Sequence, residues 1–158
     1  MKKSATTFLQ VVTVLFGIGV LALLLWEPQL EGRNAHATLF EIYFMDPFLA
    51  FVYAGSVPFF VALYQTFKIL GLVGKNAIIS QAAVKALRTI RYCGIALIGF
   101  VIAAEIMIMV SGPDELPPPI FMGLLICFGA TLMATAAATF EKILQNALEL
   151  KSENDLTV

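Results

Sequence analysis

The sequence predicts an all-α, polytopic membrane protein with four transmembrane helices in an antiparallel bundle, and three observations support this. First, 59% of the 158 residues are hydrophobic and only 13% are charged, whereas soluble domains carry about 25% charged residues. Second, four apolar tracts are long enough to cross a hydrocarbon core of about 30 Å. Third, none of them shows the period of two that a barrel strand requires. A single transmembrane domain over residues 1–158 is therefore expected.

The predicted spans cover residues 8–26, 47–72, 92–110 and 120–140. Lipid offers the backbone no hydrogen-bond partner, so each span should be an α-helix. The first tract could instead be a secretory signal peptide, since Lys2 and Lys3 precede it and residues 35–37 (AHA) resemble a cleavage site. Its apolar run is too long for such a peptide and AHA lies well beyond it, so we expect the first tract to be retained as a span.

Lysine and arginine fall almost entirely in the N-terminus, the second loop and the C-terminus, with Arg33 as the exception. Because these residues concentrate in cytoplasmic loops, both termini are expected in the cytoplasm. The first outer loop contains LFEIYFMD, which could form a short interfacial helix before Pro47. The second outer loop, residues 111–119, is expected to be a proline-stiffened acidic cap.

Residues 76–91 are predicted to form a cytoplasmic amphipathic helix, capped by Asn76 or Ser80. Lys85, Arg88 and Arg91 recur at every third residue, which places three cations along one side. This basic stripe either meets anionic lipid headgroups, which is the simpler explanation, or docks an acidic cytoplasmic partner. Residues 141–158 are predicted to form a cytoplasmic tail.

Small residues mark the expected helix contacts, because membrane helices associate through close packing. Pro58 should kink the second span, since proline removes the hydrogen bond to the carbonyl of Ala54, and the Ser56 hydroxyl could take up a freed backbone group. The candidate packing residues are Ala130, Ala134, Ala138, Thr131 and Thr135 in the fourth span and Gly99 in the third.

Glu105, in FVIAAEIMIMV, is the one carboxylate expected well inside the bilayer. Tyr53 reaches a similar depth and is its expected hydrogen-bond partner, with Ser56 as a further candidate for this intramembrane polar site. Because a charge in lipid is costly, we expect a neutral, hydrogen-bonded acid. Helical geometry places it on the side of its span away from Gly99, facing lipid, a second subunit or another helix.

Catalytic and metal-binding patterns are missing from the sequence. His36 stands alone, and no HExxH, GxSxG or phosphate-binding glycine loop occurs. Cys93 and Cys127 should lie at different depths, so no disulfide is expected. We therefore expect no enzyme activity, no cofactor or metal, and no direct contact with nucleic acid.

Three segments, SVPFFVALYQTFKILGLV, AVKALRTIRYC and ILQNALELKSENDLTV, carry a more specific signal. Over residues 56–158 they resemble a bacterial family of four-span inner-membrane proteins known only as a domain of unknown function, and the ending KSENDLTV is the most specific mark. The resemblance implies a multi-pass protein of the bacterial inner membrane. It also implies a gene beside a small helix-turn-helix regulator, and hence a transcription regulator as partner. The outer loop and Glu105 lie outside the matched pattern.

The matched residues cluster on the expected cytoplasmic side, where the acidic tail is expected to fold back on the basic stripe. The candidate interaction face comprises Tyr64, Gln65, Lys68, Lys85, Arg88, Arg91, Lys151, Glu153 and Asp155. The sequence therefore predicts a non-enzymatic membrane protein, in contact with lipid, whose cytoplasmic face binds a regulatory protein. A small transporter or proton-linked channel using Glu105 is the alternative, and a homo-oligomer stays open.

Overall fold

The computed structural model describes residues 3–30, 36–112 and 117–156. These residues form five helices and no strand: α1 (Lys3–Leu30), α2 (Leu39–Phe44), α3 (Pro47–Gly74), α4 (Gln81–Ser111) and α5 (Pro117–Leu156). The four long helices are sufficiently long and apolar to cross a membrane. The prediction of an all-α protein with four membrane spans is confirmed.

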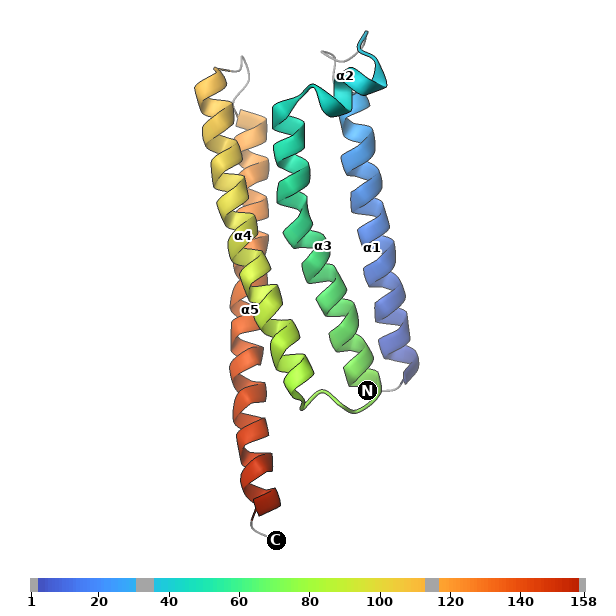
Figure 1. Ribbon diagram of the computed structural model, residues 1–158, viewed down its shortest axis with the longest axis vertical. Coiled ribbons are helices and arrows are strands. Elements are labelled where there is room, and N and C mark those ends of the chain that lie inside the picture. The colour runs from blue at the N-terminus through green and yellow to red at the C-terminus, as the bar shows by residue number, and fades with distance from the viewer. Residues whose placement is uncertain (1–2, 31–35, 113–116, 157–158) are drawn as a thin grey trace.

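The long helices alternate in direction along the chain (Figure 1). α4 packs most extensively against α5 and then against α3, while α1 is attached to the rest through α3. The start of α1, the end of α3, the start of α4 and the end of α5 share one end of the bundle. We call this the terminal end. It is the end that the distribution of lysine and arginine assigns to the cytoplasm.

The helix predicted over residues 76–91 begins later and does not stand alone. Ser80 is the N-cap, and its side chain accepts a hydrogen bond from the amide of Ala83 at 3.3 Å. From Gln81 the helix continues without a break through the third span. Asn76 has φ of 53°, in the left-handed region, so residues before Ser80 form the turn between α3 and α4.

The first outer loop contains the short helix expected from LFEIYFMD, now seen as α2. Thr38 and Glu41 form a capping box: the Thr38 hydroxyl accepts from the Glu41 amide at 3.3 Å, and the Glu41 carboxylate accepts from the Thr38 amide at 2.8 Å. The Tyr43 hydroxyl donates to the carbonyl of Leu25. α2 is thereby tied to the end of α1.

The buried core lies where α3, α4 and α5 meet, at Ala62, Leu87, Ile90, Cys93 and Ala137. Both cysteines are free, as expected.

The backbones of α4 and α5 approach each other closely at Gly94. A Cβ at Gly94 would lie 2.9 Å from both the Ala130 carbonyl oxygen and the Ala134 Cβ, so Ala130 and Ala134 lie against α4. Ala138 is half-buried on the same helix. The packing role given to Gly99 is wrong, because a Cβ there would have nothing within 4 Å. Five residues at about 100° each put Gly94 and Gly99 on different faces.

The threonines of α5 also differ from the expected packing. Thr131 and Thr135 are exposed, and the Thr131 hydroxyl donates to the carbonyl of Cys127 in its own helix. In α3 the helix runs through Pro58 without interruption. The Ser56 hydroxyl donates to the Tyr53 carbonyl at 2.7 Å rather than to that of Ala54. The kink at Pro58 stays a prediction.

Candidate functional site

An ion-pair cluster at the terminal end joins α4 to α5. Arg88 Nε donates to Oε1 of Glu141 at 2.7 Å, and Arg91 Nη1 lies 3.0 Å from Oε2 of the same carboxylate. The Glu141 side chain is only 5% exposed, while that of Arg88 is 49% exposed. Gln145, one turn further along α5, donates to Oε1 at 3.4 Å. Oε1 thus accepts from two donors, whereas Oε2 is paired with the charge of Arg91 without a hydrogen bond from the described residues. The two cations leave the cluster with a net positive charge.

The sequence explains why these residues meet. Glu141 is the first charged residue after the apolar part of α5, and Arg91 is the last cation before the apolar part of α4. Both therefore lie at the same boundary of the membrane. Lys85 belongs to the predicted stripe but is exposed. A spacing of three residues falls about 60° short of a full turn at each step, so the stripe winds away from α5.

The predicted fold-back of the acidic tail onto the basic stripe is wrong. Glu141 occupies the place opposite Arg88 and Arg91, and α5 continues as a helix to Leu156. Lys151 and Glu153 are exposed on this helix. The side chain of Asp155 lies outside the described residues, as do residues 113–116 of the predicted acidic cap.

α5 extends beyond the other helices at the terminal end (Figure 1). It has 40 residues, or about 60 Å at about 1.5 Å per residue, twice a hydrocarbon core of about 30 Å. We call residues 141–156 the α5 extension. Ile143 and Leu150 on it are 53% and 63% exposed. They lie seven residues apart, on one side of the helix, and the sequence reasoning had missed them as candidates.

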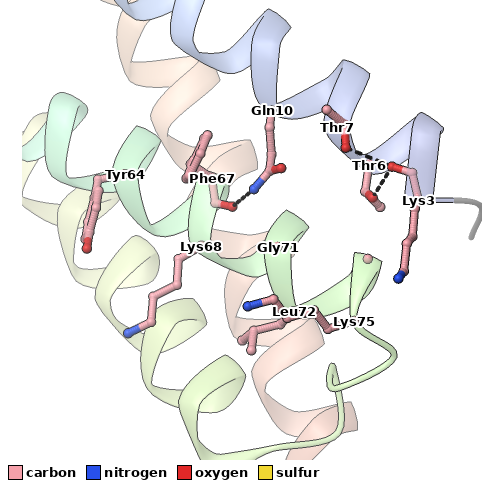
Figure 2. A pocket seen from close by; sticks show the side chains of 11 residues that line it. Lys3, Thr6, Thr7, Gln10, Tyr64, Phe67, Lys68, Gly71, Leu72 and Lys75 are labelled. Atoms are coloured by element: carbon pink, nitrogen blue, oxygen red, sulfur yellow. Dashed lines mark hydrogen bonds between the residues drawn. The ribbon is translucent and has the colours of Figure 1, made fainter.

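A second feature of the terminal end is an open groove between α1 and α3, of about 630 Å³ (Figure 2). Three lysines line it: Lys3 from α1, Lys68 from α3, and Lys75, the C-cap residue that follows α3. The Gln10 amide donates to the carbonyl of Phe67 at 3.1 Å and joins the two helices there. The other lining residues are Thr6, Thr7, Gln10, Tyr64, Phe67, Gly71, Leu72 and Gly74.

The predicted interaction face is therefore divided. Tyr64 and Lys68 line the α1/α3 groove, whereas Gln65 is not among its lining residues. Arg88 and Arg91 are held by Glu141. The remaining described members of the face lie on the first turns of α4 or on the α5 extension. The sequence did contain a signal for the ion-pair cluster, because Glu141 carries the opposite charge to Arg88 and Arg91 and lies at the same expected depth in the membrane.

The predicted intramembrane site does not assemble. The Tyr53 hydroxyl donates to the carbonyl of Leu24 in α1 at 3.1 Å, so Tyr53 is not the partner of Glu105. Glu105 instead lies against α5, where its carboxyl carbon would be 2.7 Å from a Cβ on Gly123. Its Oε2 is buried, and among the described residues it has no hydrogen-bond partner. Of the three surroundings left open, a helix of its own bundle is the observed one.

The fold defines a multi-pass helical membrane protein with four spans. The chain belongs to the family described as "Protein of unknown function (DUF2975)", whose model matches residues 33–158. It is also similar to the "Uncharacterized membrane protein YoaS" of Bacillus subtilis (strain 168), with 37% identity over 161 aligned positions that cover all of both chains. No solved structure matches it significantly.

The family assignment confirms the resemblance to a membrane family of unknown function. The match begins at residue 33 and so includes most of the first outer loop, which the resemblance over residues 56–158 had left out, and it also includes Glu105. The C-terminal mark KSENDLTV, the neighbouring regulator gene and the orientation of the termini stay predictions.

Proposed function

We propose that this protein is a non-enzymatic membrane protein that binds a cytoplasmic protein through the α5 extension. The observation that carries the proposal is the exposure of Ile143 and Leu150 on a helix that has passed beyond the hydrocarbon core. Inside the membrane, exposed aliphatic side chains are covered by lipid. Outside it they meet water, so a pair on one side of a helix favours a protein partner.

The surroundings of this pair suit a reversible interface. Lys142, Glu149 and Lys151 are exposed next to the apolar pair, and transient interfaces combine an apolar centre with a charged rim. The ion pairs to Glu141 hold the base of the extension against α4. The partner class that the sequence resemblance implies is a small helix-turn-helix transcription regulator, held at the membrane and released when a signal changes the bundle.

Copurification of the full chain with crosslinked partners from its own host tests the proposal. Replacing Ile143 and Leu150 together by serine should remove the partner. Replacing Asn146 and Asn154 together by serine is the matched control on the same helix, since both are exposed but polar, and it should retain the partner. A third chain lacking residues 151–158 tests the tail. Identical partner sets for all four chains would contradict the proposal.

Transport through Glu105 is the second candidate, favoured by its buried Oε2 atom, which has no hydrogen-bond partner in the part of the chain that the structure describes. Against it, neither the α1/α3 groove nor the smaller groove beside it is lined by Glu105. Proton flux into proteoliposomes, measured for the wild type and for Glu105→Gln, decides the matter. Flux that disappears in the variant supports transport, and no flux in either chain removes it.

A further inference from the structure

We propose that the α1/α3 groove binds one anionic phospholipid, with the headgroup phosphate at Lys3, Lys68 and Lys75 and an acyl chain between α1 and α3. This site is separate from the α5 extension, and the proposal does not depend on the function proposed above.

Positive charge is concentrated in the groove without local compensation. Lys68 lies in the last two turns of α3, Lys75 is the C-cap that follows Gly74, and Lys3 lines the same groove from α1 (Figure 2). No aspartate or glutamate is among the described residues that line the groove. The carbonyls of Gly71, Leu72 and Val73 near the end of α3 accept hydrogen bonds from the amides of residues 75–77, which removes these three as competing acceptors. The groove therefore favours an anion.

The depth of the lysines matches that of lipid phosphates. Residues 47–67 of α3 precede Lys68 without a Lys, Arg, Asp or Glu. At about 1.5 Å per residue they span about 30 Å, the thickness of a hydrocarbon core. Lys68 therefore lies at the membrane surface, and Tyr64, one turn earlier, lies at its edge, where aromatic side chains with a polar tip are enriched.

An apolar groove of about 300 Å³ continues from the basic one toward the membrane interior. The two share Tyr64 and Phe67, so they are contiguous. The hydroxyl of Thr13 in this groove donates to the carbonyl of Leu9 at 2.8 Å and presents no free donor. The other lining residues are Val14, Gly17, Phe60, Leu63, Tyr64 and Phe67.

This juxtaposition distinguishes a lipid from a soluble phosphate. A free phosphate would use only the lysines, whereas a phospholipid also fills the apolar groove next to them. Gly17 keeps that groove open, because a Cβ there would lie 3.3 Å from Leu63 Cδ1. At the basic end, α1 and α3 approach closely, because a Cβ on Gly74 would lie 2.6 Å from Thr6 Oγ1.

Native mass spectrometry of the full chain in neutral detergent measures the binding. The probes are phosphatidylglycerol, phosphatidylcholine and glycerol phosphate. Lys68→Gln/Lys75→Gln should weaken phosphatidylglycerol binding about 30-fold (about 2 kcal/mol), since each basic residue at an anionic membrane surface contributes about 1 kcal/mol. Lys85→Gln/Lys142→Gln, which removes equal charge at exposed positions outside the groove, is the matched control and should change it less than threefold.

A second pair of variants tests the acyl chain. Val14→Phe should fill the apolar groove and weaken phosphatidylglycerol at least fivefold, whereas Val12→Phe, on an exposed position outside the groove, should not. Lys68→Arg/Lys75→Arg should retain phosphatidylglycerol binding, which would show that binding depends on the positive charge and not on lysine itself. Equal losses in both lysine double variants would overturn the proposal in favour of general surface attraction. Full competition by glycerol phosphate, with no effect of Val14→Phe, would assign the site to a soluble phosphate.

Discussion

Arg88 and Glu141 lie 53 residues apart in the chain, yet Arg88 Nε donates to Glu141 Oε1 at 2.7 Å. The hydrogen bond fixes the register of α4 against α5 where both helices leave the apolar region. Because Glu141 is almost fully buried, losing its partners would leave a carboxylate without water or donors.

Replacing Glu141 by alanine removes the carboxylate that Arg88 and Arg91 share. The free energy of unfolding should fall by about 2 kcal/mol, a figure reduced from that of a fully buried pair because Arg88 is half exposed. Glu149→Ala, on an exposed residue of the same helix, should change stability by less than about 0.5 kcal/mol. Thermal unfolding in detergent measures both. The exchange Arg88→Glu/Glu141→Arg should restore part of the loss, and no recovery would contradict a direct pairing.

The four spans could be predicted because a membrane imposes length and apolarity on every helix, and each tract of residues 8–26, 47–72, 92–110 and 120–140 lies within one of the long helices. The residue at which α4 begins was harder to predict from the sequence. Asn76 and Ser80 are both residue types that commonly cap helices. The structure decides between them, because Asn76 has a left-handed backbone within the turn and Ser80 has the extended backbone of the N-cap.

The contacts between helices could not be predicted, because they depend on rotation about each helix axis. Gly94 and Gly99 look equivalent in the sequence, but only Gly94 faces α5. Depth alone paired Glu105 with Tyr53, whereas the rotation of α3 turns Tyr53 toward α1. The arginines of α4 were recognised as a cluster, and their partner was sought in the distant tail instead of at the same depth on α5.

Gly94→Ala should separate α4 from α5. The added methyl group would lie 2.9 Å from the Ala130 carbonyl oxygen and from the Ala134 Cβ, and neither can move without its helix. A loss of about 2 kcal/mol in unfolding free energy is expected. Gly99→Ala is the matched control in the same helix, where the methyl group meets open space, and it should not destabilise. Equal effects of the two changes would contradict this packing.

The capping box of α2 should make this helix sensitive to acid. The hydrogen bonds from the Thr38 amide and hydroxyl lower the pKa of Glu41 below its ordinary value of 4.5. A lowered pKa adds stability above the unfolded-state value, and that stability is lost as the pH falls through the folded-state value. Amide exchange of residues 39–44, corrected for its intrinsic pH dependence, should therefore quicken below pH 4.5. Glu41→Gln keeps an acceptor but cannot titrate, so its protection should not change over this range.

Orientation can be tested with fusions. Because Arg33 is the one cation expected outside, a fluorescent protein fused after Val158 should fold in the cytoplasm, and alkaline phosphatase fused after Ala37 should be active. An active phosphatase at the C-terminus would reverse the assignment of the terminal end and remove the cytoplasmic partner from the proposed function.

Substitutions of Glu105 and Gly123 should have coupled effects on the stability of the fold. A methyl group on Gly123 would overlap the Glu105 carboxylate, whose flexible side chain must then turn out from α5 toward lipid. Gly123→Ala should therefore destabilise the fold by about 1 kcal/mol and make Glu105 reactive toward a hydrophobic carbodiimide, which modifies protonated acids in lipid. Gly129→Ala, whose methyl group meets nothing within 4 Å, should do neither.

In a Glu105→Ala background, the loss of stability caused by Gly123→Ala should disappear, because the overlapping side chain is gone. Additive effects of the two substitutions, with unchanged labelling, would show that the carboxylate does not depend on this glycine.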